Sequence, residues 1–139
     1  MRIEVPQDKR LVHETVMQIR WGDMDAFGHV NNTIYFRYME QARIEWMNSL
    51  GYGLATSDES MLMVNGFCNF YQQLTYPGDI LVKTFVGAVG TSSADIYNTI
   101  ALKSDPESLS AEGGATMVWV DLKRNKSMPW PEQYLVHLS

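Results

Sequence analysis

One segment with helical periodicity lies among segments that alternate with a period of two, and this order limits the folds open to the chain. Residues 33–50 place one apolar stripe at helical spacing: Tyr35, Tyr38, Met39, Ala42, Trp46 and Leu50. Alternating or apolar segments typical of strands lie at 11–20, 61–74, 80–89, 94–103 and 109–122. Long adjacent strands joined by short turns predict an antiparallel sheet, on which the one long helix must pack. The sequence therefore predicts an α+β fold.

The helical segment carries further apolar residues away from this stripe. Phe36, Ile44 and Met47 lie off it, so we expect a helix that is covered on more than one side. Asn31 or Asn32 is the expected N-cap, because an Asn side-chain oxygen accepts a hydrogen bond from an unpaired N–H of the first turn. A short helix is also expected from about Pro131 to the end of the chain.

Length and composition limit the classes of function. The chain has 139 residues, which predicts one domain over residues 1–139. A net charge of −5 argues against general attraction to nucleic acid or to an anionic membrane. Cys68 is the only cysteine, the N-terminus has no apolar signal segment, and no apolar run approaches the roughly 20 residues that span a bilayer. We therefore expect a cytoplasmic protein.

The loop before the helix carries the most specific chemistry. It places Asp23 and Asp25 ahead of Gly28-His29 and of Asn31-Asn32, where the helical period begins. The N–H groups at a helix N-terminus are unpaired and lie at the positive end of the helix dipole. A carboxylate that faces such groups suits attack on a carbonyl, because the acid supplies the base or nucleophile and the N–H groups stabilise the oxyanion.

The run Asp-Met-Asp-Ala-Phe-Gly-His-Val-Asn-Asn at residues 23–32, followed by Tyr35, Tyr38, Glu40 and Ala42-Arg43, resembles the 4-hydroxybenzoyl-CoA thioesterase family. The resemblance implies a hotdog fold, in which a five-stranded antiparallel sheet wraps one long central helix. It further implies hydrolysis of an acyl-CoA-type thioester to a free acid and a thiol. Asp25 would be the nucleophile or the general base, and the backbone N–H near Asn32 would be the oxyanion donor.

The resemblance also bears on substrates and partners. The first-described branch has an aliphatic residue in place of His29 and lacks the Asn pair, whereas plant acyl-carrier-protein thioesterases carry His-Val-Asn-Asn. The carrier is therefore either CoA or acyl carrier protein. The turn Gly90-Thr91-Ser92-Ser93 lacks the basic residues that meet the nucleotide of CoA in that branch. No metal or redox cofactor is expected, and the family implies a homodimer or homotetramer with a pocket between protomers.

Each polar candidate also has a purely structural interpretation. Aspartate is common in turns, so Asp25 would form the turn or cap the helix. Asp23 would bind loop N–H groups or pair with Arg20. His29 would orient the thioester, bind the loop backbone or hold Asp25. For Asn32, capping by the side chain and polarisation of the substrate by the N–H are compatible.

Apolar candidates for substrate binding lie on the helix and on the next predicted strand. Tyr35, Phe67 and Phe70 are the expected substrate-binding residues, and Met61 and Met63 would extend an acyl tunnel, with ordinary core packing as the alternative for all of them. Nothing near Cys68 supplies a base for a nucleophile. The three histidines are spaced unlike a metal site: His13, His29 and His137.

Two other functions remain open on the sequence. One is a protein that binds acyl thioesters without cleaving them. The other is a hotdog hydratase or dehydratase, which uses an acid and a histidine at other spacings than the one here, where His29 is four positions after Asp25.

Overall fold

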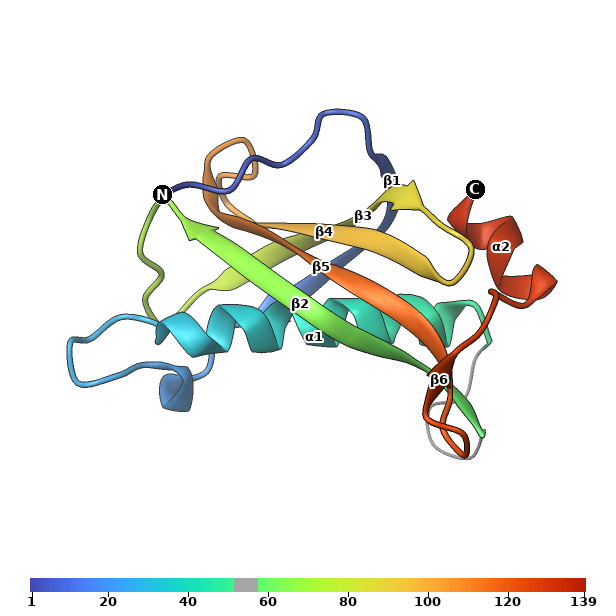
Figure 1. Ribbon diagram of the computed structural model, residues 1–139. Helices are drawn as coiled ribbons and strands as arrows, with labels where there is room; N and C mark the ends of the chain where they lie inside the picture. The colour runs from blue at the N-terminus through green and yellow to red at the C-terminus, as the bar shows by residue number, and fades with distance from the viewer. Residues whose placement is uncertain (52–57) are drawn as a thin grey trace.

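An antiparallel sheet with one long helix against it forms most of the structure (Figure 1). The computed structural model describes residues 1–51 and 58–139. The elements in chain order are β1 Arg10–Gln18, the 3-10 helix Trp21–Asp23, α1 Asn32–Ser49, β2 Glu59–Phe70, β3 Asp79–Val89, β4 Ser93–Leu102, β5 Leu109–Asp121, β6 Lys126–Ser127 and α2 Glu132–Leu138. The predicted fold class is confirmed, and the structure also contains the short strand β6 and the 3-10 helix. No helix of the described ranges is long and apolar enough to cross a membrane.

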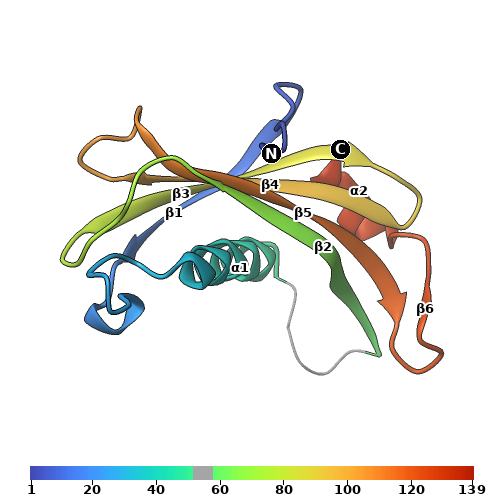
Figure 2. The same cartoon turned by 60° about the vertical axis from the view of Figure 1, so that its left-hand side comes forward.

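The strand order is β1-β3-β4-β5-β2, with β6 paired to β5, and every pairing is antiparallel. Figure 2 shows α1 lying beneath the curved sheet, with β2 at its margin. Within the described residues, β2 pairs only with β5, so β2 has one unpaired edge. This sheet positions α1 and the loop before it.

The predicted stripe of α1 faces the sheet. Tyr35, Tyr38, Met39 and Ala42 join one buried cluster with residues of β3 and β4 such as Ile80 and Ile100. The later part of α1 joins a second cluster with the C-terminal segment, made of Trp46, Met47, Trp119, Trp130 and Leu138 among others. The expectation of burial on more than one side holds for Met47, while Phe36 stays 39% exposed.

A bulge in β2 sets the direction in which the predicted site residue Phe67 points. The register with β5 shifts between Met63 and Asn65, so the strand has one extra residue, Val64. A shift of one residue turns all later side chains to the opposite face of the sheet. Odd-numbered residues before Val64 and even-numbered residues after it therefore face the same side. Before the bulge, Met61 packs against the helix-side core, and after it Cys68 does so.

Phe67 consequently faces away from α1. It lies opposite Gly114, where an added Cβ would come 2.9 Å from the Phe67 ring and 2.6 Å from Tyr97. At the next glycine, Gly113, an added Cβ would instead meet Met39 of α1 at 2.9 Å. Phe67 therefore does not line the cleft described below, and its predicted role in substrate binding stays a prediction.

The strand predicted over residues 61–74 ends at Phe70. The N–H groups of Tyr71 and Gln72 both donate to Ser110 O, at 2.9 and 3.0 Å, where the chain leaves the sheet. Leu74 is buried beneath the loop before α1, which explains why this position is apolar, but Leu74 is not part of a strand. This connection brings residues 71–74 next to that loop.

Candidate functional site

Asp23 holds the start of the loop to the middle of α1. Its Oδ2 accepts hydrogen bonds from Arg20 N at 2.9 Å and from the Tyr38 hydroxyl at 2.7 Å, and its Oδ1 lies 3.5 Å from Arg20 Nε. Burial raises the pKa of Tyr38, and the hydrogen bond to Asp23 raises it further. Both carboxylate oxygens thus have partners inside the chain, and these contacts fit the structural role expected for Asp23.

The loop from Met24 to Val30 is closed on itself. Met24 pairs with Val30 as an isolated antiparallel bridge, and Asp25 N donates to His29 O at 3.0 Å. Gly28 turns the chain with φ of 80°, a conformation that glycine adopts without strain, and its N–H donates to Asp25 O at 3.1 Å. Val30 N donates to Leu74 O at 2.8 Å, which joins the loop to the connection after β2.

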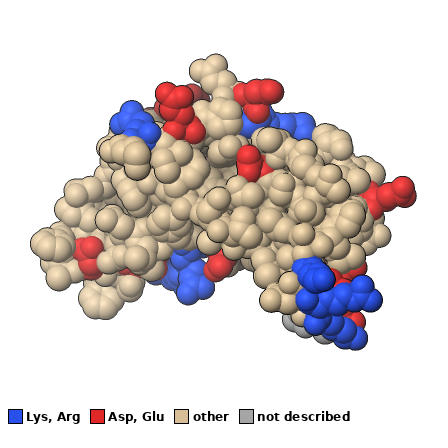
Figure 3. Space-filling model, in the orientation of Figure 1, with Lys and Arg blue, Asp and Glu red and all other residues tan. Residues whose placement is uncertain are grey.

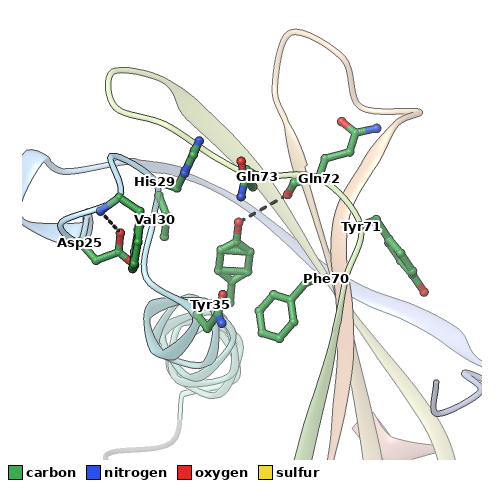
Figure 4. A pocket seen from close by; sticks show the side chains of 10 residues that line it. Asp25, His29, Val30, Tyr35, Phe70, Tyr71, Gln72 and Gln73 are labelled. Carbon is green, nitrogen blue, oxygen red and sulfur yellow. Dashed lines mark hydrogen bonds between the residues drawn. The ribbon is translucent and has the colours of Figure 1, made fainter. Parts of the chain in front are cut away.

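A cleft of about 470 Å³ opens between this loop, the start of α1 and the connection after β2. It is lined by Asp25, Phe27, His29, Val30, Asn32, Tyr35, Phe70, Tyr71, Gln72 and Gln73. Figure 4 shows Asp25, His29 and Val30 on one side of the cleft, and Phe70 and Gln72 on the other. The cleft therefore brings together the loop acid and the start of the helix, as the sequence predicted.

Asp25 is half-buried in this cleft and has one oxygen engaged. Its Oδ1 accepts a hydrogen bond from Phe27 N at 2.9 Å, so the turn-forming interpretation also holds. Within residues 1–51 and 58–139, no hydrogen bond reaches Oδ2. The turn thus orients the carboxylate and leaves one oxygen for a ligand.

The cap of α1 is Asn31, which corrects the prediction for the Asn32 side chain. Asn31 Oδ1 accepts from Thr33 N at 2.9 Å, and Asn31 O accepts from Ile34 N at 2.9 Å. Asn32 is the first residue of the helix and lines the cleft. Its backbone N–H has no acceptor in the described part of the chain, so it is an unpaired donor at the positive end of the helix dipole.

Two of the three predicted substrate-binding residues lie in the cleft. The Tyr35 ring lies 5.0 Å from the Phe70 ring, and its hydroxyl makes a long hydrogen bond of 3.5 Å to Gln72 O (Figure 4). Burial raises the pKa of Tyr35, so the hydroxyl is neutral near pH 7. Together Tyr35 and Phe70 give the cleft an apolar wall.

His29 lies at the cleft, but its side chain does not hold Asp25. The hydrogen bond between the two residues joins Asp25 N to the backbone oxygen of His29, and the described residues offer the imidazole no hydrogen-bond partner. The imidazole is therefore available to a ligand. Phe27, Gln72 and Gln73 also line the cleft and were not predicted. The polar pair Gln72-Gln73, which interrupts an apolar run, was the signal available for two of them.

Other chemistries find little support in the described residues. Burial raises the pKa of the Cys68 thiol to about 12, which disfavours a thiolate nucleophile. Within those residues, no group of three or more His, Cys, Asp or Glu side chains is placed to hold a metal ion.

Comparison with known proteins assigns the family. The family model of the thioesterase-like superfamily matches residues 19–138. The chain belongs to the thioesterase-like superfamily. Among solved structures, the PA2801 protein of Pseudomonas aeruginosa, a candidate thioesterase, shares 33% identity and a TM-score of 0.90 with it, over 94% of this chain and 100% of the other. A candidate acyl-CoA thioesterase of Xanthomonas campestris shares 35% identity and a TM-score of 0.75, over 81% and 95%.

A curated relative of this thioesterase-like chain is the chloroplastic acyl-acyl carrier protein thioesterase ATL3 of Arabidopsis thaliana. The two are 32% identical over 117 residues, which cover 80% of this chain and 60% of the plant protein. The predicted hotdog thioesterase family is confirmed at the level of the superfamily, and these relatives support a hydrolase.

Proposed function

We propose that the protein hydrolyses an acyl thioester, with Asp25 as nucleophile or general base and the Asn32 N–H as oxyanion donor. One observation carries the proposal: a carboxylate with one free oxygen and an unpaired N–H at a helix N-terminus line the same cleft. A thioester carbonyl between them would meet a base or nucleophile on one side and a polarising donor on the other.

Both mechanisms use the same two groups. In the first, Asp25 takes a proton from water, which attacks the carbonyl, and the negative charge on the carbonyl oxygen is stabilised at the Asn32 N–H. The tetrahedral intermediate then expels the thiolate. In the second, Asp25 attacks the carbonyl itself, the tetrahedral intermediate expels the thiolate and becomes a mixed anhydride, and water hydrolyses the anhydride. Each route yields one free acid and one thiol.

The remaining cleft residues suit an acyl substrate. Tyr35 and Phe70 supply an apolar surface next to the reacting groups, and His29 supplies a donor or acceptor at the cleft. Asp25, water and the helix N-terminus suffice for this chemistry, so we propose that no metal or redox cofactor takes part.

The carrier is CoA or acyl carrier protein. The Xanthomonas relative is described as acting on acyl-CoA, and the plant relative is named for acyl-acyl carrier protein. We further propose that the protein acts in the cytoplasm as a homodimer or homotetramer.

The decisive variant is Asp25→Asn, because the amide oxygen can still accept from Phe27 N and keep the turn. We expect turnover to fall by about 10³-fold or more, while binding of the acyl thioester survives. Release of free thiol from CoA and carrier-protein thioesters of graded acyl length measures turnover, and calorimetry measures binding. The matched control is Asp105→Asn in an exposed turn, which should leave turnover unchanged.

Near-normal thiol release by Asp25→Asn would remove Asp25 from the chemistry. The same panel separates the rival functions. A hydratase would change the absorbance of an enoyl thioester without freeing thiol, and a binding protein would do neither.

A further inference from the structure

A second groove, of about 240 Å³, lies next to the cleft along the same two elements, α1 and β2. On α1, Phe36 of the groove directly follows Tyr35 of the cleft. On β2, Gly66 of the groove lies four residues before Phe70 of the cleft, so the two share one face of the strand. An acyl group that leaves the cleft in this direction therefore enters the groove.

Apolar and small residues form much of this groove. Phe36 and Met39 of α1 and Met63 of β2 give it apolar walls, and Gly66 and Ala115 of the sheet add little bulk. An added Cβ at Gly66 would lie 3.3 Å from Met63 Sδ, so a side chain there would narrow the space. The face of the molecule over β2 and β5 is also largely uncharged (Figure 3). These surroundings suit a hydrocarbon chain.

Arg43 brings a buried cation to this apolar space. The residue lines the groove and is only 8% exposed. Among the described residues, its guanidinium donates one hydrogen bond, to Met63 Sδ at 3.8 Å. A thioether is a weak acceptor, whereas a guanidinium has five N–H donors. A buried cation in this state lacks the partner that usually compensates its desolvation.

The nearest carboxylate along the helix does not supply that partner. Burial lowers the pKa of Arg43, and the charge of Glu40 opposes this effect only in part. Glu40 Oε1 lies 3.2 Å from Arg37 Nη1, and the side chains of Glu40 and Arg37 are 54% and 70% exposed. The groove residues that come from the sheet carry no charge. The acceptor that Arg43 lacks must therefore come with a ligand.

We propose that Arg43 binds a carboxylate at the far end of the acyl group, so that the substrate is a thioester of a dicarboxylic acid. A carboxylate matches the planar donor fork of a guanidinium and forms strong, charge-assisted hydrogen bonds with it. The apolar walls before Arg43 suit the hydrocarbon chain that joins the two ends of such an acyl group. This inference rests on the proposed function, since the same acyl group has its thioester carbonyl at Asp25.

The geometry of α1 limits the length of this acyl group. Arg43 lies eleven positions after Asn32, which corresponds to ~16 Å along the helix axis at a rise of ~1.5 Å per residue. Arginine side chains on a helix point back towards its N-terminus, which shortens the span to the guanidinium. A suberyl chain suits this span, whereas a succinyl chain is too short to reach Arg43 from the start of α1.

The test compares suberyl and octanoyl thioesters of the same carrier, which have equal chain length and differ in the terminal carboxylate. We expect the unaltered protein to have a kcat/KM about tenfold or more higher for the suberyl thioester. Arg43→Met removes the charge at similar volume and should lose this preference, mainly through KM, because Arg43 binds a group that does not react. Succinyl and butyryl thioesters should differ little.

The matched control is Arg124→Met, because the Arg124 side chain is 82% exposed in the turn after β5. This variant should keep the full preference for the suberyl thioester. Replacing an uncompensated buried cation by methionine should be tolerated, and thermal unfolding checks that Arg43→Met folds. Should it not fold, the preference of the unaltered protein decides.

Binding to Asp25→Asn gives a readout that needs no turnover. We expect calorimetry to show about tenfold tighter binding of monomethyl suberate than of dimethyl suberate, and no such difference in Asp25→Asn/Arg43→Met. Arg43-dependent binding without thiol release would refute only the proposed hydrolysis. Equal binding of the two esters, binding of neither, or a suberyl preference that survives in Arg43→Met would overturn the inference.

Discussion

Tyr38 donates a hydrogen bond of 2.7 Å to Oδ2 of Asp23, and both residues are buried. This bond links the middle of α1 to the start of the loop that carries Asp25. The acid of the cleft is thus positioned by a second acid, two residues earlier, whose own oxygens are bound inside the chain.

Removing the Tyr38 hydroxyl should destabilise the protein without affecting the apolar packing. We expect Tyr38→Phe to lower the free energy of unfolding by about 2 kcal/mol, because a hydrogen bond to a buried carboxylate is lost. Urea unfolding followed by tryptophan fluorescence measures the change. Tyr76→Phe is the control, since Tyr76 is 43% exposed. Equal effects of the two variants would show that the bond to Asp23 contributes nothing particular.

Stability should also fall in alkaline solution. Burial raises the pKa of Tyr38 and of Tyr35 above the ordinary value for tyrosine, which is near 10. Their neutral forms therefore favour the folded state, and this contribution is fully present below about pH 10 and is lost as the pH rises towards the folded pKa values. Urea unfolding from pH 8 upward should show a decline beginning near pH 10, with a shallower slope in Tyr38→Phe. A flat profile in the unaltered protein would contradict this assignment.

The two asparagines at the start of α1 should respond differently to alanine. Asn31→Ala removes the acceptor for Thr33 N, so we expect a loss of about 1 kcal/mol in unfolding free energy. Asn32→Ala keeps the backbone N–H and no cap is lost, so stability should be nearly unchanged and thiol release only modestly reduced. A large loss of turnover in Asn32→Ala would place its side chain in the reaction.

Gly113 of β5 should tolerate no side chain. An added Cβ would lie 2.3 Å from Phe67 O and 2.9 Å from Met39 Sδ, and the backbone oxygen cannot move aside without disturbing the pairing of β2 and β5. We expect Gly113→Ala to cost about 3 kcal/mol or more, at the upper end of overpacking. Gly22→Ala is the control, because an added Cβ there meets nothing within 4 Å. Thermal unfolding of both variants checks the contrast.

Periodicity and one loop pattern predict much of this structure. The stripe of α1 is readable because Tyr35, Tyr38 and Met39 recur at helical spacing and bury against the sheet. Asp25 and Asn32 were found from the loop pattern, and the structure places both in one cleft. Their roles in catalysis stay predictions.

The parts that escaped prediction depend on contacts distant in sequence. Val64 continues the apolar run that begins at Met61, so its residue type does not mark it as the extra residue that turns Phe67 outward. The sequence could not predict which asparagine caps α1, because Asn31 and Asn32 are adjacent and have equal capping ability. Where the helix begins depends on how the loop is held, including the bond from Val30 to Leu74.

The pairing of Met24 with Val30, and of Val30 with Leu74, has a consequence for how tightly a substrate could be held. A loop closed at its base and tied to a neighbouring segment has already lost most of its conformational entropy when the protein folds. Little of the binding energy of an incoming acyl group is then used to order the loop, so more remains for stabilising the transition state.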